Sequence, residues 1–528
     1  MEKIWLSAYD PDVPVSIDYP RIPLHQAFFE AASRFGRAAA LTFGDRPISY
    51  TDLAARVEAL SRALARLGAG TGTRVGVFLP NVPEMVITYY AVLATGAAAV
   101  MLSPTLVGPE FAGLAADAGF DILVVADELL PAVSGQGSEP SFKTVVVVGG
   151  SGVVAGDATR IIAFEDLLAR GGPRFEPPVL DPREDVAVLI YTGGTTGLPK
   201  AVMLTHYALV ANALQLGVWV NLTEGYPAIA ALPLFHSYGM STGMNAAFLH
   251  GATSVLPAGE GPQELARAIA RHRVRLLVGV PSTIENLLDL PGIEDVDLSS
   301  LECCFVGAAP LPGAVRKRFD ALTDARLLEG YGLTEAVTAQ SANPAFGKSK
   351  RGSIGLPFPD VEFKIVDLET GTRELAPEKV GELVIKSPCL MKGYLDRPRD
   401  TARALRGGWL FTGDVAWVDK DGYFYVIDRK KEMVTTGVYK AYPAEVEAVI
   451  NSHPAVKESA VVGLFDDFRG HSLKAFVVLA PGGELSEQEL LAFLGQNLSA
   501  HKVPRVIEFR GELPRSSVGK ILRKELES

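Results

Sequence analysis

The chain has few cysteines and no excess of positive charge. Its 528 residues include only Cys303, Cys304 and Cys389, which are too few for a disulfide framework and lack the spacing of a metal site. A reduced, cytoplasmic location fits this usage best. Lysine and arginine number 50 against 61 aspartates and glutamates, so the net charge is −11 at pH 7, and no basic tail or stripe is present. Nucleic-acid-binding proteins usually show the opposite balance, and we set that class aside.

Long hydrophobic runs are also missing, although the mean hydropathy is +0.20. Two stretches lack Asp, Glu, Lys and Arg, Met85–Pro109 and Gly225–Gly259, but glycine and proline interrupt both. Neither supplies the roughly 20 predominantly apolar residues of a spanning helix. The first six residues run into Asp10 and Asp12 without the apolar core of a signal peptide. We therefore expect no transmembrane segment, and at most weak peripheral contact with a membrane.

Short apolar runs alternate with helical periodicity through the first part of the chain. Residues 73–80, 97–102 and 275–280 have the pattern of strands, whereas 84–95 and 262–273 have helical spacing. Such alternation is typical of parallel strands connected by helices. It predicts an α/β fold whose large N-terminal domain has several layers and mostly parallel sheets.

The pattern changes beyond about residue 350, where strands suited to hairpins predominate. The last hundred residues are typical of a small α+β unit, in which Ser486 and Glu489 form the capping box of a helix. The charged run 428–431 is the best candidate for a boundary. We expect an N-terminal domain over residues 1–427 and a C-terminal domain over 432–528.

A loop rich in glycine and threonine follows the apolar run 185–190. Its glycines permit tight turns, and its hydroxyl and N–H groups can surround a polyphosphate to which Lys200 adds positive charge. It is not a P-loop, because Leu198 stands where the second required glycine would fall. A flexible hairpin is the alternative for such a loop taken alone. The candidate phosphate-binding residues are Thr192, Gly193, Gly194, Thr195, Thr196, Gly197 and Lys200.

Six further motifs accompany the loop at Tyr191–Lys200. They are Leu232-Pro-Leu-Phe-His236, Gly307-Ala-Ala-Pro310, Gly330-Tyr-Gly-Leu-Thr-Glu335, Trp409-Leu-Phe-Thr-Gly-Asp414, Asp428-Arg-Lys-Lys431 and Pro514-Arg-Ser-Ser-Val-Gly-Lys520. Together these segments resemble, in the same order, the signature of the adenylate-forming superfamily, which includes acyl-CoA synthetases, luciferases and peptide-synthetase adenylation domains. The opening Met-Glu-Lys-Ile-Trp-Leu is similar to bacterial long-chain fatty acyl-CoA synthetases.

The resemblance implies a ligase reaction in two steps. A carboxylate attacks the α-phosphate of ATP, pyrophosphate leaves, and an acyl-adenylate remains. The thiol of coenzyme A then attacks the acyl carbonyl, and AMP leaves. ATP and coenzyme A are the implied co-substrates and Mg²⁺ the implied metal. The small C-terminal domain of such enzymes is mobile and rotates between the steps, and the resemblance makes 428–431 the hinge, with Lys431 at the pivot position.

The resemblance also assigns roles around ATP. Glu335 would hold Mg²⁺, Thr334 would bond phosphate, and Tyr331 would stack on adenine. Asp414 would accept the ribose hydroxyls with help from Arg429. Outside this pattern, Glu335 would be an ordinary carboxylate at a helix start and Asp414 part of a simple turn. The other expected ATP contacts are Gly307, Ala308, Ala309, Pro310, Glu329, Gly330 and Gly332.

The catalytic lysine of the family corresponds to Lys520, which would act with Thr334 and Glu335. Its charge would fall on the oxygen between the acyl group and the phosphate, whereas a lysine near a C-terminus is otherwise a solvated charge. Relatives often carry Ser-Gly where this chain has Gly437 and Val438, in the hairpin expected to contact coenzyme A. Valine tolerates positive φ badly, so this departure bears on the shape of that hairpin.

The motif ending in His236 bears on the acid substrate. Amino-acid-activating relatives carry an aspartate there to pair with the ammonium group, and this chain does not. Tyr238 and Thr242 follow in an uncharged stretch, and we expect them to line a hydrophobic acyl pocket with His236. The same residues also fit an ordinary core. A fatty acid is the leading substrate and a cinnamate-type aryl acid the alternative.

Two other classes of protein can share this fold. One is a luciferase-like oxygenase, which would oxidise the adenylate, and the other is a catalytically silent binding protein. Formation of a coenzyme A thioester without oxygen uptake separates a ligase from the first. Exchange of pyrophosphate into ATP separates it from the second.

Overall fold

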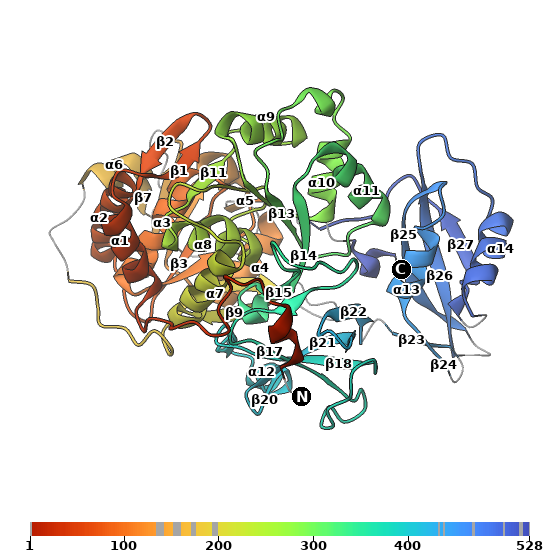
Figure 1. The fold of residues 1–528 in the computed structure, drawn as a ribbon. Coiled ribbons are helices and arrows are strands. Elements are labelled where there is room, and N and C mark those ends of the chain that lie inside the picture. Colours follow the sequence, from red (N-terminus) through yellow and green to blue (C-terminus); the bar gives the residue numbers. More distant parts are fainter. Residues whose placement is uncertain are drawn as a thin grey trace.

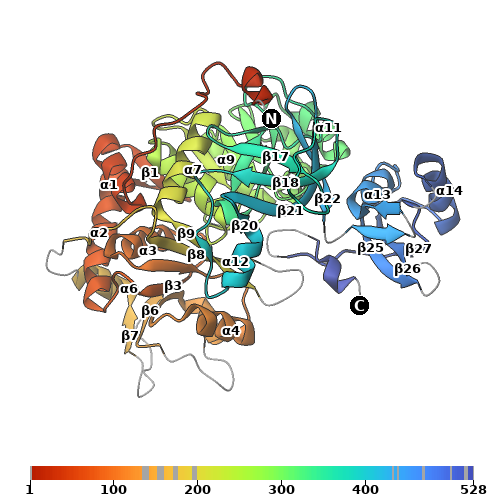
Figure 2. The ribbon, with the colours of Figure 1, turned by 90° about the horizontal axis from the view of Figure 1, so that it is seen from below.

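The structure is a computed structural model that describes residues 3–133, 142–150, 160–170, 176–192, 199–430, 433–436, 439–466, 470–499, 502–516 and 521–526. The chain forms a large body and a smaller lobe beside it, as both views show (Figure 1; Figure 2). The lobe follows β22 (Phe424–Arg429), the last strand of the body.

The first large sheet confirms the expected parallel arrangement. It has nine strands among the described residues, and its inner pairs are parallel. Strand β1 enters beside β11 from far away in the sequence, with Leu41 opposite Ser254. In spatial order the strands are β16 (Leu356–Pro357), β15 (Ala339–Ala342), β14 (Arg326–Gly332), β13 (Cys303–Val306), β12 (Leu276–Gly279), β10 (Pro227–Ala230), β11 (Thr253–Leu256), β1 (Ala39–Phe43) and β2 (Arg46–Ser49).

The second large sheet has eight strands in the part of the chain that the structure describes. Neighbouring strands in the series β8, β4, β3, β5, β6 and β7 pair parallel. Strands β8 and β9 pair antiparallel, which sets Thr192 opposite Lys200. Its order is β19 (Gly393–Tyr394), β9 (Lys200–Thr205), β8 (Val186–Thr192), β4 (Ala98–Met101), β3 (Arg74–Phe78), β5 (Ile122–Ala126), β6 (Thr144–Val148) and β7 (Arg160–Ala163).

The largest core joins these two sheets. Val77 of β3 and Leu328 of β14 belong to one cluster of buried side chains, together with residues of α3 and α7, which are buried on nearly all sides. Across the described ranges, no helix combines the length and the hydrophobicity that a membrane crossing requires. The helices are α1 (Leu24–Phe35), α2 (Tyr50–Arg66), α3 (Pro83–Thr95), α4 (Gly108–Ala118), α5 (Leu130–Val133), α6 (Phe164–Arg170), α7 (His206–Trp219), α8 (Ala246–Leu249), α9 (Pro262–His272), α10 (Pro281–Leu288), α11 (Gly313–Leu322), α12 (Pro398–Ala404), α13 (Pro443–Ile450) and α14 (Glu487–Asn497).

Two smaller sheets follow, as the change of pattern predicted. The third sheet is antiparallel and ends the large body, with strands β17 (Glu362–Val366), β18 (Gly381–Lys386), β21 (Trp409–Val418), β20 (Leu405–Arg406) and β22. The fourth sheet forms the C-terminal lobe with β24 (Tyr439–Ala441), β23 (Val434–Thr436), β26 (Gly470–Leu479), β25 (Val456–Asp466) and β27 (Val506–Phe509). The predicted fold class is therefore confirmed.

Local signals placed several elements correctly. Pro262 begins α9, as expected of proline in a first helical turn. The capping box of α14 is present, since the Glu489 amide donates to the Ser486 hydroxyl at 3.3 Å and the Ser486 amide donates to the Glu489 carboxylate at 2.9 Å. Strand β22 begins only at Phe424, because Gly422 adopts φ 87° in the turn before it.

Two buried histidines contact each other between α1 and α7. The ring centroids of His25 and His206 lie 5.8 Å apart, and the Leu24 amide donates to Nδ1 of His206 at 3.2 Å. Burial lowers the pKa of His25 to about 4 and that of His206 to about 3. Both rings are therefore neutral in the folded protein at pH 7.

This pair predicts a loss of stability in mild acid. Each folded pKa lies below the ordinary value of 6.5, so the stability is fully present above pH 6.5 and falls as the pH drops toward 4. Neutral burial of His25 contributes roughly 3 kcal/mol to this pH-dependent part of the free energy of unfolding. Urea unfolding between pH 7.5 and 4.5 measures the loss, and His25→Phe should reduce its size. An identical pH dependence in wild type and His25→Phe would contradict the assignment.

Candidate active site

Asp414 on β21 lies at the centre of the candidate nucleotide site. The side chain is buried, Tyr331 donates a hydrogen bond from its hydroxyl to Oδ2, and Nε of Arg429 lies 2.7 Å from Oδ1. Burial, and then the negative charge of Asp414, raises the pKa of Tyr331 well above its usual value, so the phenol keeps its proton. A carboxylate offers about four acceptor positions, and such a group is suited to accept hydrogen bonds from ribose hydroxyls. The structure thus brings together three of the predicted ATP residues.

The glycines beside Tyr331 leave no room for side chains. A Cβ at Gly332 would lie 1.9 Å from the carbonyl oxygen of Thr338, and one at Gly330 would lie 2.8 Å from the ring of Phe305. Strands β14 and β15 pair antiparallel at this point. The two glycines therefore allow the strand that carries Tyr331 to approach its neighbour closely.

The loop after β13 touches both the nucleotide motif and the acyl motif. A Cβ at Gly307 would lie 3.2 Å from the carbonyl oxygen of Gly330 and 3.4 Å from the hydroxyl of Tyr238. That hydroxyl donates to the carbonyl of Phe305 at 3.1 Å. Ala308 adopts φ 68°, a conformation that residues other than glycine rarely take, and the three residues after Gly307 are exposed. Such strain is often found where a loop meets a ligand, as the predicted adenine contact requires.

Glu335 lies in η5 (Thr334–Ala336), a short turn after β14. The Tyr394 hydroxyl donates to its Oε1 at 2.8 Å, and the Met391 amide donates to its backbone carbonyl at 2.8 Å. Thr334 is buried, and its hydroxyl lies 3.3 Å from that of Ser237. No sequence pattern pointed to Tyr394, which holds the carboxylate in place.

The carboxylate of Glu335 is a suitable ligand for a magnesium ion that would be bound together with ATP. Magnesium in such sites is bound by one or two carboxylates together with substrate phosphates. Among the described residues, Tyr394 is the one hydrogen-bond partner of this carboxylate, which leaves Oε2 for a cation. The same residues contain no group of three or more His, Cys, Asp or Glu that could hold a metal unaided.

Lys200 is the first residue of β9 and interacts with Asp400 and Tyr394. Its Nζ lies 2.9 Å from Oδ2 of Asp400 and 5.3 Å from the centre of the Tyr394 ring. The hydrogen bond from Lys200 lowers the pKa of Asp400. Tyr394 therefore interacts both with Lys200, through its ring, and with the candidate metal ligand Glu335, through its hydroxyl. Gly193, Gly194, Thr195, Thr196 and Gly197, predicted to bind phosphate, lie outside the described residues.

Glu329 is engaged by the protein itself. Its carboxylate lies 2.8 Å from the Arg316 guanidinium, and both side chains are largely buried. The Gly352 amide also donates to it, at 3.3 Å. Breaking a buried ion pair is costly, so contact between this side chain and ATP stays a prediction.

The acyl motif leads into a π-helix, η3 (Gly239–Asn245), whose residues are all buried. The hydroxyl of Thr242 donates to the carbonyl of Tyr238 at 2.6 Å, and the Tyr238 amide donates to Nδ1 of His236 at 3.1 Å. Burial lowers the pKa of His236 to about 4, so the ring is neutral at pH 7 and carries its proton on Nε2. π-Helices are rare and often occur at functional sites, and the sequence pattern did not predict this one.

The linker between β22 and β23 is bonded on both sides. The Ala444 amide, at the start of α13, donates to Oδ2 of Asp428 at 2.8 Å. Nζ of Lys430 lies 2.7 Å from Oε2 of Glu382 in the body. Arg429 pairs with Asp414, as described above. The predicted hinge, coenzyme A and catalytic residues Lys431, Gly437, Val438 and Lys520 lie outside the described residues.

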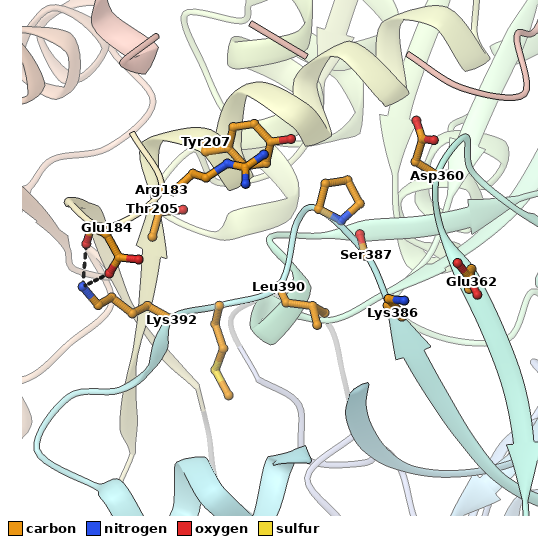
Figure 3. Close-up of a pocket in the computed structure, with 12 residues that line it drawn as sticks. Arg183, Glu184, Thr205, Tyr207, Asp360, Glu362, Lys386, Ser387, Leu390 and Lys392 are labelled. Carbon is orange, nitrogen blue, oxygen red and sulfur yellow. Dashed lines mark hydrogen bonds and ion pairs between the residues drawn. The ribbon is translucent and has the colours of Figure 1, made fainter. Parts of the chain in front are cut away.

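Figure 3 shows a cleft of about 530 Å³. Its lining includes Met391, whose amide donates to the backbone carbonyl of Glu335. Arg183 stacks 4.5 Å from the centre of the Tyr207 ring, and Lys392 pairs with Glu184 at 3.2 Å. The predicted site residues that the structure describes lie elsewhere. Other lining carboxylates are engaged outside the cleft, since Asp360 accepts from Tyr19 at 2.9 Å and Glu362 lies 3.5 Å from Lys3. We assign this cleft no part in nucleotide binding.

Two family models match most of the chain. The model of the AMP-binding enzymes matches residues 28–395, and that of the AMP-binding enzyme C-terminal domain matches residues 445–520. Because the first match covers more than half of the chain, the chain belongs to the AMP-binding enzyme family. The resemblance to adenylate-forming enzymes is therefore confirmed.

Known relatives extend the similarity from end to end. A long-chain-fatty-acid–CoA ligase of Bacillus subtilis is 36% identical over 562 residues, covering 99% of this chain and 98% of that protein. A feruloyl-CoA synthase of Amycolatopsis is 36% identical over 494 residues, covering 93% of this chain and 95% of its own. The crystal structure of an anthranilate CoA ligase in complex with anthranoyl-AMP matches with a TM-score of 0.87 and 27% identity, over 98% of this chain and 97% of that one.

Proposed function

We propose that the chain is an AMP-forming fatty acid–CoA ligase. The buried helix η3, which would receive the acid, begins next to Tyr238, and Tyr238 touches the loop at Gly307 beside Gly330. A buried, uncharged segment that adjoins a nucleotide site is what the joining of a fatty acid to AMP requires. This contact carries the proposal, and the full-length similarity to a long-chain-fatty-acid–CoA ligase supports it.

The first step joins two anions. A carboxylate oxygen of the fatty acid forms a bond to the α-phosphorus of ATP, and the bond from that phosphorus to pyrophosphate breaks. Positive charge and hydrogen-bond donors must be held in place for this approach. We assign Asp414 and Arg429 to the ribose, Thr334 to the phosphates, and Lys520 to the oxygen between acyl group and phosphate. Glu335 would hold a magnesium ion, which would neutralise phosphate charge.

The second step needs a different arrangement of the lobe. The sulfur of coenzyme A forms a bond to the acyl carbon, its proton is released, and AMP leaves. We propose that the lobe turns about residues 428–431, with Lys431 as the pivot and with Gly437 and Val438 near coenzyme A. The hydrogen bond from Ala444 to Asp428 joins the two sides of this pivot, so a large rotation must break it. That bond therefore belongs to one orientation.

The surroundings of η3 favour a hydrocarbon acid. The neutral ring of His236 cannot act as the counter-ion of an ammonium group, and η3 itself contains no charged residue. An aryl acid is a second candidate, because the feruloyl-CoA synthase is also 36% identical to this chain.

A cytoplasmic location is part of the proposal. The three cysteines are free and buried, and burial raises the pKa of Cys303 and of Cys389 to about 12. These thiols stay protonated at pH 7 and are suited to a reducing compartment.

A larger side chain at position 242 should shorten the preferred acid. Thr242→Leu adds bulk where we place the acyl chain, whereas Thr242→Val keeps the size and loses only the hydroxyl bond to Tyr238. We expect Thr242→Leu to lower the ratio of kcat/KM for hexadecanoate over octanoate about ten-fold, and Thr242→Val to keep the wild-type ratio. An unchanged ratio in folded Thr242→Leu would mean that Thr242 belongs only to the core.

A panel of acids tests the substrate class. Straight-chain acids from acetate to octadecanoate and aryl acids such as ferulate are each supplied with ATP and coenzyme A, and thioester formation is measured by chromatography. The proposal predicts the highest kcat/KM for a long-chain acid, without oxygen uptake. A preference for ferulate would replace the fatty acid with the aryl candidate.

A further inference from the structure

Glu382 on β18 is a buried carboxylate outside every motif that the sequence singled out. Only 5% of it is exposed. Its Oε1 accepts the N–H of Gly413 at 3.2 Å, and its Oε2 accepts a hydrogen bond from Nζ of Lys430 at 2.7 Å. Removing a carboxylate from water is costly unless such partners compensate, so both contacts are needed to keep it there.

The first partner, Gly413, directly precedes the candidate ribose ligand Asp414. The register of β21 against β18 shifts across residues 411–415, and Gly413 adopts φ 71° there. Glu382 supplies the acceptor for the Gly413 amide within this irregular stretch. Bulges of this kind redirect the neighbouring side chain, which here is that of Asp414.

The second partner, Lys430, closes a ring of contacts. Its backbone amide donates to the carbonyl of Gly413 at 2.7 Å, while its ammonium group bonds Glu382. Gly413 precedes Asp414, and Lys430 follows Arg429, which pairs with Asp414 at 2.7 Å. The contacts among Glu382, Gly413 and Lys430 therefore fix the backbone beside Asp414 and Arg429. They also fix the first part of the linker to the body.

We propose that Glu382 is a positioning residue that sets the Asp414–Arg429 pair for the ribose and fixes the start of the linker. The inference rests on the proposed function, in which that pair binds the nucleotide. Glu382 acts through its two partners and does not touch the nucleotide. Its bond to Gly413 governs nucleotide affinity, whereas its bond to Lys430 governs the orientation of the linker and so the balance between the two half-reactions.

Three variants separate the two bonds. Glu382→Leu removes both, and we expect AMP to bind about ten-fold more weakly, because the Gly413 amide loses its acceptor. Glu382→Gln keeps an acceptor of the same shape and should restore the affinity to within about two-fold. Lys430→Met should leave the AMP affinity near that of the wild type. It should change the ratio of thioester formation to adenylation by the same factor as Glu382→Gln does, because each removes the charged contact of the linker.

The measurements are the dissociation constant of AMP by calorimetry and the rates of the two half-reactions. Lys386→Met, an exposed lysine on the same strand, is the control and should change neither quantity. A purely structural role would lower the melting temperature and leave the AMP affinity and the rate ratio of the folded fraction unchanged, and that result would overturn the inference. If Glu382→Leu does not fold, AMP binding about ten-fold weaker in Glu382→Gln together with an unchanged rate ratio in Lys430→Met would overturn the inference as well.

The AMP measurement uses no acid, so it is distinct from the test of the proposed function. Dependence of AMP binding on Glu382 in a protein that activates no fatty acid would support the inference and refute the fatty acid proposal. Fatty acid activation with wild-type AMP binding in Glu382→Leu would do the opposite. A wild-type protein that binds no AMP would refute both.

Discussion

Replacing Lys520 by alanine should slow acyl-adenylate formation about 10²–10³-fold and leave thioester formation from supplied acyl-AMP unchanged. Negative charge grows between the acyl oxygen and the α-phosphorus during the first step, and a positioned ammonium group stabilises it there. Lys520 lies far beyond the linker in the sequence, so it can reach this oxygen only when the lobe is docked in one orientation. Under the proposed rotation of the lobe, the second step would use another orientation and would not need this charge.

Two assays on each variant test this expectation. Pyrophosphate release from hexadecanoate and ATP reports the first step, and thioester formation from acyl-AMP and coenzyme A reports the second. Lys457→Ala, an exposed lysine of the same lobe, is the matched control and should alter neither rate. Equal slowing of both steps by Lys520→Ala would rule out a role confined to adenylation.

Replacing Glu335 by glutamine should lower kcat/KM for magnesium-bound ATP about 100-fold while the affinity for AMP alone changes little. The amide has the size of the carboxylate but no charge to hold the cation. Tyr394→Phe removes only the hydrogen bond to Oε1 at 2.8 Å, so its loss should be smaller, about ten-fold. The measurement is pyrophosphate release across a titration of Mg²⁺, on variants whose fold is checked by circular dichroism. Wild-type rates at limiting Mg²⁺ in folded Glu335→Gln would show that this carboxylate does not hold the metal.

Local chemistry made much of the fold predictable. The alternation of apolar and helical periods gave parallel sheets, Pro262 began α9, and Ser486 with Glu489 formed the cap of α14. Each signal depends on neighbouring residues, so it can be read along the chain. The position of β1 beside β11 cannot be predicted from neighbouring residues, because the packing of the whole body decides the pairing of Leu41 with Ser254.

The site divides in the same way. The resemblance of the motifs to those of adenylate-forming enzymes pointed to Asp414, Arg429 and Tyr331, which the structure brings into direct contact. The motifs did not reveal Tyr394 or Glu382. The roles of these two residues depend on hydrogen bonds to residues that are distant in the sequence. The π-helix η3 was also missed, since an inserted helical residue leaves no distinct hydrophobic period.

Exchange of labelled pyrophosphate into ATP, measured with hexadecanoate and without coenzyme A, tests the central claim most directly. The account predicts exchange that requires both the fatty acid and Mg²⁺, because the first step is reversible and precedes any contact with the thiol. No exchange with any straight-chain acid, in a folded protein that binds ATP, would contradict it.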